Sequence, residues 1–320
     1  MKYRFKQLIF GVAIAIACIA LGKMCNQVIG VFRSVNWAWV ILATTGLTLY
    51  QWLNASVWKD VIAGIGGEVS RAHAIRIWIQ SESMKWLPGG IWGYGSRVMN
   101  ARRLGITPQL ASASLAIELL LTITAWAATV VWIIPTRMSS DLVDFLPVSF
   151  GRVSILAWCI PMVAICILLF VYFMKFDPKR LPLVGCLLGS SGRLDWQPKW
   201  LVRSAACYGG LCLLNGTLLW LVICAVPGLV VPWATTLGIG GIAWLAGFFA
   251  IGVPGGIGVR EAVLAGLLHR YGSMEAAFAT AVIFRASQVS AELIALTASL
   301  ICGWRENQNA LAINDPSVIS

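Results

Sequence analysis

Long runs of apolar residues dominate the chain, and polar residues fall mainly in the short breaks between them. A helix needs about 20 apolar residues to cross the hydrocarbon core of a bilayer. Runs of that order lie at roughly 8–30, 35–58, 107–134, 152–174, 203–226, 232–252 and 274–303. The pattern predicts an all-α, polytopic transmembrane bundle with about 7 to 8 spans.

The composition supports this fold class and excludes several functions. Hydrophobic residues make up 59% of the chain and charged residues 12%, with a mean hydropathy of +0.81, whereas a soluble domain has about 25% charged residues. The 9 cysteines are scattered, and no C-x-x-C pair occurs. We therefore expect no metal, no cofactor and no disulfide framework. We also find no established catalytic motif and assign no catalytic residue.

The chain reads as a single transmembrane domain over residues 1–305 followed by a polar tail at 306–320. The most hydrophilic internal segment, 175–202, contains several Pro, Gly and Ser residues and predicts a cytoplasmic loop. It separates two halves, at about 35–174 and 203–305, that share sequence features. These halves predict an internal repeat.

We attribute the net charge of +11 mainly to the orientation of the protein in a membrane. If the N-terminus is cytoplasmic, most of the 24 Lys and Arg residues lie on the cytoplasmic side, as the positive-inside rule requires. The first apolar run lacks a clear cleavage site and predicts a retained anchor. We expect a multi-pass protein of the bacterial inner (cytoplasmic) membrane that contacts anionic lipid, and no nucleic-acid partner.

One tetrapeptide occurs in both halves, as Pro88-Gly89-Gly90-Ile91 and as Pro254-Gly255-Gly256-Ile257. Each copy interrupts a segment that is too short or too broken to cross a membrane as an ordinary helix, and the glycines between Gly89 and Gly105 are expected to continue the first interruption. We expect both copies to form glycine-broken re-entrant elements, and we leave open on which side the C-terminus lies. Bare backbone at membrane depth needs protein or water to satisfy it, so the motifs imply a polar cavity.

The second copy leads directly into a helix. Glycines admit a ligand close to the backbone, and a helix N-terminus favours an anion. This pattern predicts a lipid-phosphate site; the alternative is a tight turn in which the charged side chains pair locally. The candidate residues are Pro254, Gly255, Gly256, Gly258, Arg260 and Glu261.

The first copy has cations on both sides of its turn. Lys85 precedes the helix breaker at the expected membrane boundary, and Arg97 follows it. Both can reach a phosphate headgroup by extending along the membrane interface, although positive-inside anchoring explains them equally well. The candidate phosphate-binding residues here are Lys85, Pro88, Gly89, Gly90 and Arg97.

Charged residues within the apolar runs are a third indication of a functional site, after the two glycine motifs. A charge at mid-bilayer usually faces a cavity or a partner. Glu118, Arg285 and Glu292 are such residues, and Gln288 lies on the same helix face as the last two. The repeat relates Glu118 to Arg285, which predicts an ion pair between them. The residues line a translocation path or form a purely structural bridge.

The motifs around Lys85 and Gly255, together with Arg285, resemble those of the lysylphosphatidylglycerol synthase transmembrane region family, over nearly the whole chain. The family includes the membrane domain of bacterial multiple peptide resistance factors. The resemblance implies a polytopic helical fold and a flippase-like role in moving a charged lipid between leaflets. The soluble aminoacyl-transfer domain of the synthases is absent from this sequence, so lipid aminoacylation is not implied.

We expect a membrane protein that binds and flips an anionic phospholipid or a polyprenyl-phosphate lipid, in the biogenesis of cell-envelope lipid or polysaccharide. One alternative is a non-catalytic partner of a glycosyltransferase or an envelope-assembly complex. Another is an intramembrane lipid-phosphate transferase, which needs a general base or a metal-holding carboxylate. Its candidates are Glu82, Glu261, His73 and His269.

Overall fold

The computed structural model describes residues 30–86, 92–133, 198–250 and 254–313, and helices make up the regular structure of these ranges. The α-helices are α2 (Trp37–Gly64), α3 (Arg71–Glu82), α4 (Trp92–Arg103), α5 (Pro108–Ile133), α8 (Pro198–Ala225), α9 (Trp233–Phe249), α10 (Val259–Leu268) and α11 (Met274–Ile313). Short 3-10 helices are η1 (Ser83–Trp86), η4 (Pro254–Gly256) and η5 (His269–Tyr271). The prediction of an all-α protein is confirmed.

Among the described helices, α5, α8 and α11 contain stretches long and apolar enough to cross a membrane, at Pro108–Val131, Lys199–Ala225 and Met274–Cys302. Helix α9 is apolar but shorter. Helix α2 has the length of a span, at 28 residues. Its polar side chains lower its mean hydropathy, so it is not among the helices apolar enough to qualify. The predicted spans at 8–30 and 152–174 lie outside the described residues.

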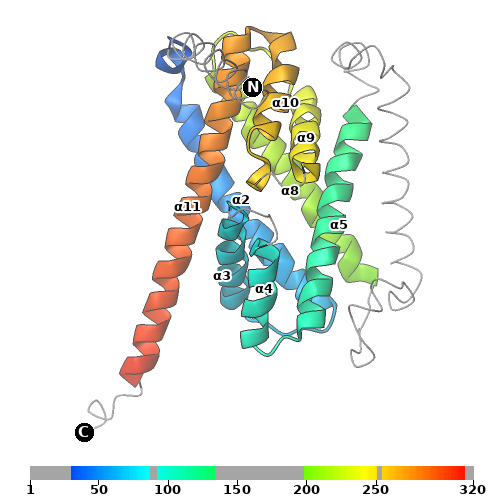
Figure 1. Ribbon diagram of the computed structural model, residues 1–320, viewed down its shortest axis with the longest axis vertical. Helices are drawn as coiled ribbons and strands as arrows, with labels where there is room; N and C mark the ends of the chain where they lie inside the picture. Colours follow the sequence, from blue (N-terminus) through cyan, green and yellow to red (C-terminus); the bar gives the residue numbers. More distant parts are fainter. Residues whose placement is uncertain (1–29, 87–91, 134–197, 251–253, 314–320) are drawn as a thin grey trace, which may run out of the picture.

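Two helical hairpins organise the molecule (Figure 1). Helix α3 packs against α4, and α9 packs against α10. Their broken ends, η1 and η4, contact each other. The α3/α4 hairpin lies in the lower half of Figure 1 and the α9/α10 hairpin in the upper half, so they meet tip to tip near the middle while α11 runs past both.

Helix α4 corrects one expectation, since the glycines between Gly89 and Gly105 were expected to interrupt helical structure. The chain is helical from Trp92 to Arg103. A Cβ at Gly93 would lie 2.9 Å from the carbonyl oxygen of Ser81. This glycine therefore serves the close packing of α4 against α3.

The apolar core is divided by a polar layer. Along α2, Val40 and Leu47 belong to one cluster of buried apolar side chains, and Trp58 belongs to a second. Gln51 and Asn54 lie between them and are also buried. The polar layer falls at the level where the two hairpin tips meet.

Candidate functional site

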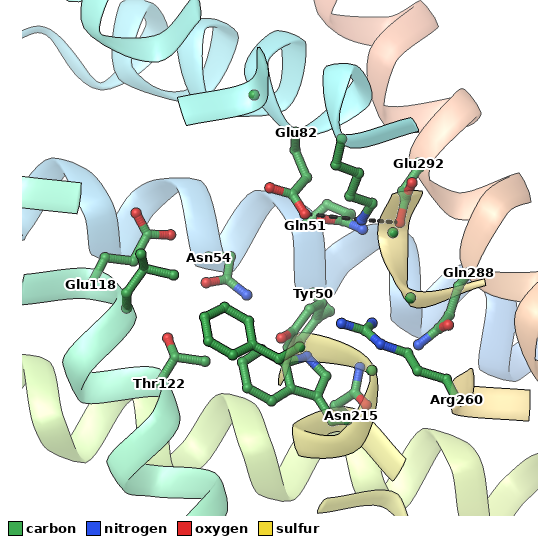
Figure 2. Close-up of a pocket in the computed structure, with 18 of the residues that line it drawn as sticks. Tyr50, Gln51, Asn54, Glu82, Glu118, Thr122, Asn215, Arg260, Gln288 and Glu292 are labelled. Carbon is green, nitrogen blue, oxygen red and sulfur yellow. Dashed lines mark hydrogen bonds and ion pairs between the residues drawn. The ribbon is translucent and has the colours of Figure 1, made fainter. Parts of the chain in front are cut away.

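A cavity of about 430 Å³ lies between the hairpin tips, within the range of about 300–1,000 Å³ typical of ligand pockets. All the described α-helices contribute to its wall, and Figure 2 shows how their polar side chains converge on it. Its lining includes Tyr50, Gln51, Asn54, Trp78, Glu82, Lys85, Tyr94, Arg97, Glu118, Thr122, Asn215, Trp244, Phe248, Gly255, Gly256, Arg260, Arg285, Gln288 and Glu292. Cations and carboxylates are both well represented there.

Lys85 bridges the first hairpin tip and α11. Its Nζ lies 2.9 Å from Oε1 of Glu82 and 2.7 Å from Oε1 of Glu292 (Figure 2). Lys85 lies in η1, which leads to the first glycine motif, whereas Glu292 comes from the long last helix. The ion pair therefore ties this tip to α11.

These ion pairs keep both groups of the tip charged. Burial alone would raise the pKa of the Glu82 carboxyl and lower that of the Lys85 amine, because it penalises each charged form. Attraction outweighs burial: Lys85 and Arg97 hold the pKa of Glu82 below its usual value, while Glu82 and Glu292 hold that of Lys85 above its own. We therefore treat Glu82 as a carboxylate and Lys85 as an ammonium at neutral pH.

Arg97 is the most enclosed cation of the cavity wall, with only 2% of its surface exposed. Its guanidinium donates to Oε2 of Glu118 at 2.5 Å and to Oγ of Ser81 at 2.8 Å. It also lies against the ring faces of Trp58 and Trp78, with centroids at 5.4 and 5.2 Å. Because these contacts already occupy its guanidinium, we infer that Arg97 holds α3, α4 and α5 together.

Glu118 has partners that differ from the expected one. Besides Arg97, its carboxylate accepts a hydrogen bond from Nε1 of Trp78 at 2.9 Å. The predicted Glu118–Arg285 ion pair is wrong. Because α4 packs directly against α5, the nearest cation to Glu118 comes from the preceding hairpin helix and not from the opposite half of the chain.

Arg285 holds the second hairpin tip. Its Nη2 donates to the carbonyl oxygen of Gly255 at 2.9 Å, and its Nε lies 3.1 Å from Oε1 of Glu261. Its Nη1 donates to Oε1 of Gln288 at 3.2 Å. Helix α11 thus secures both tips, through Arg285 and, seven residues later, through Glu292.

The second glycine motif forms the tight turn that its sequence predicts. Gly255, Gly256 and Gly258 have φ of 59°, 69° and 81°, a left-handed region that disfavours other residues. The start of α10 is already capped, because the backbone N–H of Gly258 donates to Oε2 of Glu261 at 2.6 Å. The carboxylate of Glu261 thus occupies the position that we expected an external anion to take.

Arg260 differs from the other cations of the cavity. Its guanidinium carbon lies 5.6 Å from the ring centroid of Trp244, and its stem packs against Gly247 so closely that a Cβ there would collide with it. Among the described residues no carboxylate forms an ion pair with Arg260, and its buried Nε has no hydrogen-bond acceptor. The cavity therefore contains a positioned cation that has no counterion in the part of the chain that the structure describes.

The structure brings most of the predicted site residues together. Lys85, Arg97, Glu118, Gly255, Gly256, Arg260, Arg285, Gln288 and Glu292 line the central cavity. Glu261 lines a smaller neighbouring pocket, and Gly258 begins the adjoining helix. Pro254 starts η4, and Pro88, Gly89 and Gly90 lie outside the described residues.

Sequence reasoning missed the uncharged part of the wall. Tyr50, Gln51 and Asn54 of α2 and Asn215 of α8 line the cavity but were read as parts of ordinary spans. A usable signal was present, because Gln51 and Asn54 interrupt an otherwise apolar run three residues apart, which places them on neighbouring positions of one helix face.

No group of three or more His, Cys, Asp or Glu side chains arranged to hold a metal ion occurs in the described ranges. His73, a candidate base of the enzyme alternative, is half-buried and is hydrogen-bonded to Ser70 at the start of α3. His269 is exposed, at the far end of α10. Neither histidine lines the cavity.

Comparison with known proteins identifies the family. The profile described as the lysylphosphatidylglycerol synthase TM region matches residues 8–295. No curated protein matches the chain. Because the match covers most of the sequence, and because apolar helices long enough to span a membrane are present, the chain belongs to the lysylphosphatidylglycerol synthase transmembrane region family of membrane proteins.

Proposed function

We propose that the protein binds the phosphate of a lipid headgroup in the central cavity and moves that headgroup between the two leaflets of the bacterial inner membrane. The lipid is an anionic phospholipid or a polyprenyl-phosphate lipid. The observation that carries the proposal is Arg260, a cation fixed over Trp244 with no counterion among the described residues. A phosphate oxygen supplies the acceptor that its guanidinium lacks, in a charge-assisted hydrogen bond.

The surroundings of the cavity suit an amphiphile. Apolar helices around a polar cavity allow the acyl or prenyl tails to stay in hydrocarbon while the headgroup enters. We interpret the two hairpins as re-entrant elements that approach the cavity from opposite sides of the membrane, an arrangement that recurs in transporters built from inverted repeats. Each tip is tied to α11, by Lys85–Glu292 and by Arg285–Gly255.

These two attachments suggest how the cavity opens. Release of the Lys85–Glu292 ion pair would free the first tip, and release of the Arg285 contacts would free the second. We expect the headgroup to enter and leave the cavity as one tip is released at a time.

The test is a leaflet-resolved assay in reconstituted vesicles, in which a quencher outside the vesicle reports a fluorescent anionic phospholipid arriving in the outer leaflet. Arg260→Gln should slow the movement at least tenfold, because a charge-assisted hydrogen bond contributes about 1.5–3 kcal/mol. Arg203→Gln is the matched control: it makes the same charge change at a side chain that is 76% exposed. Equal movement by the Arg260→Gln variant and the wild-type protein would refute the proposed function.

A further inference from the structure

Part of the cavity wall is neither charged nor apolar. Four uncharged polar side chains, which we call the polar belt, face the cavity from three helices: Gln51 and Asn54 of α2, Thr122 of α5 and Asn215 of α8. In Figure 2, Asn54 and Thr122 lie on the side of the view away from Glu292 and Gln288, whereas Gln51 and Asn215 lie nearer its middle. Gln51 and Asn54 are only 8% and 7% exposed.

The belt is short of hydrogen bonds. In the part of the chain that the structure describes, the side chains of Gln51, Thr122 and Asn215 form none. Gln51 is buried and Thr122 and Asn215 are half-buried, so their polar groups are left for water or a ligand in the cavity to satisfy. An amide offers both a donor and an acceptor, as a hydroxyl group does. The belt is therefore matched to a ligand with several hydroxyl groups.

Aromatic rings lie next to the belt. Tyr50, Trp244 and Phe248 line the same cavity, and the rings of Trp244 and Phe248 stack with centroids 5.3 Å apart and planes 7° from parallel. Flat apolar faces beside a few convergent polar groups are typical of small-molecule sites. Because Arg260 and Phe248 already cover the Trp244 ring, Tyr50 and Phe248 supply the aromatic surface for the C–H groups of a sugar or polyol.

The carboxylates of the cavity do not offer a site for an amino group. Glu82 pairs with Lys85, Glu118 pairs with Arg97, and Glu292 pairs with Lys85. An ammonium group in the ligand would have to displace one of these cations, leaving it without its counterion. The charge pattern thus favours a headgroup that is anionic without being cationic as well.

We propose, building on the phosphate site at Arg260, that the headgroup is a phosphorylated polyol without an amino group. Its phosphate contacts Arg260 and its hydroxyl groups bind the polar belt. A phosphoglycerol headgroup and a polyprenyl-linked phosphosugar share this chemistry.

The test compares lipids that differ only in the headgroup, bound to the purified full-length protein in nanodiscs and quantified by native mass spectrometry. Phosphatidylglycerol should bind at least tenfold more tightly than phosphatidylpropanol, which has the same charge and lacks both headgroup hydroxyls, and more tightly than lysylphosphatidylglycerol. Polyprenyl phosphoglucose against the methyl ester of polyprenyl phosphate forms the second pair. If the lipid with headgroup hydroxyls binds more tightly only in the phosphatidyl pair, the headgroup belongs to a phospholipid. If it does so only in the polyprenyl pair, the headgroup belongs to a polyprenyl lipid.

Two variants separate the parts of the site. Asn215→Leu should weaken phosphatidylglycerol binding about three- to tenfold, the effect of one hydrogen-bonding group, and leave phosphatidylpropanol binding unchanged. Arg260→Gln should weaken both by the same factor. The comparison of lipids on the wild-type protein stands even if a variant does not fold.

The outcomes are distinct. Equal affinity within both lipid pairs, with binding weakened by Arg260→Gln, would overturn the polyol headgroup and leave the phosphate site intact. Tighter binding of lysylphosphatidylglycerol than of phosphatidylglycerol would also overturn it. Binding that Arg260→Gln does not affect would remove the proposed function itself.

Discussion

The buried pair of Arg97 and Glu118 offers the sharpest test of the structure. We expect Arg97→Met to lower the free energy of unfolding by about 3–5 kcal/mol, because breaking a buried ion pair leaves an uncompensated charge. The structure supports the upper part of this range. Arg97 is 2% exposed and also binds Ser81 and two tryptophan faces, all of which the substitution removes.

The pairing itself is measured by double-mutant cycles with Glu118→Leu. Because Arg97 and Glu118 are in contact, the double variant should be more stable than the sum of the single effects predicts, by about 1–3 kcal/mol. The cycle of Glu118→Leu with Arg285→Met is the control. It should be additive within about 0.5 kcal/mol, since these residues share no contact in the described structure.

The assay is denaturant unfolding of the detergent-solubilised protein, followed by far-UV circular dichroism. Strict additivity between Arg97 and Glu118 would refute the assignment of this pair. A coupling of Glu118 to Arg285 larger than its coupling to Arg97 would instead support the ion pair that the repeat predicts.

Two further predictions concern the hairpins. Gly256→Ala should destabilise the protein by about 1–2 kcal/mol or more, because its φ of 69° disfavours a side chain and a Cβ would lie 2.8 Å from a carbonyl oxygen of α9. Gly209→Ala is the control. Because nothing lies within 4 Å of a Cβ at Gly209, this variant should be neutral or slightly stabilising in the same melting experiment. Trp78→Phe should lower the free energy of unfolding by about 1.5–3 kcal/mol, because it removes the hydrogen bond to Glu118. The control, Trp39→Phe at an exposed position, should lower it by less than about 0.5 kcal/mol. Equal effects of the two variants within either pair would contradict the geometry.

The sequence was sufficient to predict which segments meet. The glycine motifs break helices, and a broken helix in a membrane needs a polar cavity, so the convergence of Lys85, Gly255 and Arg260 follows from the pattern alone. In the described structure these residues line one cavity. The turn geometry around Gly255 was predictable for the same reason, since the left-handed conformation requires glycine.

The choice of charge partners was not predictable from the repeat. Glu118 and Arg285 occupy positions that the predicted repeat relates. Glu118 pairs with Arg97 of α4, and Arg285 pairs with Glu261 of α10, so each partner lies on the second helix of the preceding hairpin. The charges are reversed between these two pairs, so the predicted repeat suggests a partner for Glu118 that differs from the observed one. Pairing depends on which helices pack together, and sequence spacing does not determine packing between distant segments.

The role of Gly93 shows the same limit. A glycine in a polar segment reads as a helix breaker, yet here it allows α4 to approach the backbone of α3 at Ser81. The distinction depends on a neighbour outside the local sequence. Glu82 was likewise considered only as a candidate base of the enzyme alternative, although it contacts both Lys85 and Arg97.

The polar character of α2 has a consequence for biosynthesis. Gln51 and Asn54 lie in the middle of this helix, with Lys59 and Asp60 one to two turns further along, so α2 partitions into lipid less readily than α5 or α11. Its most extensive packing partner is α8, which the ribosome synthesises more than a hundred residues later. We therefore expect α2 to stay beside the translocon, shielded from acyl chains, until α8 emerges and the two enter the bilayer as a unit.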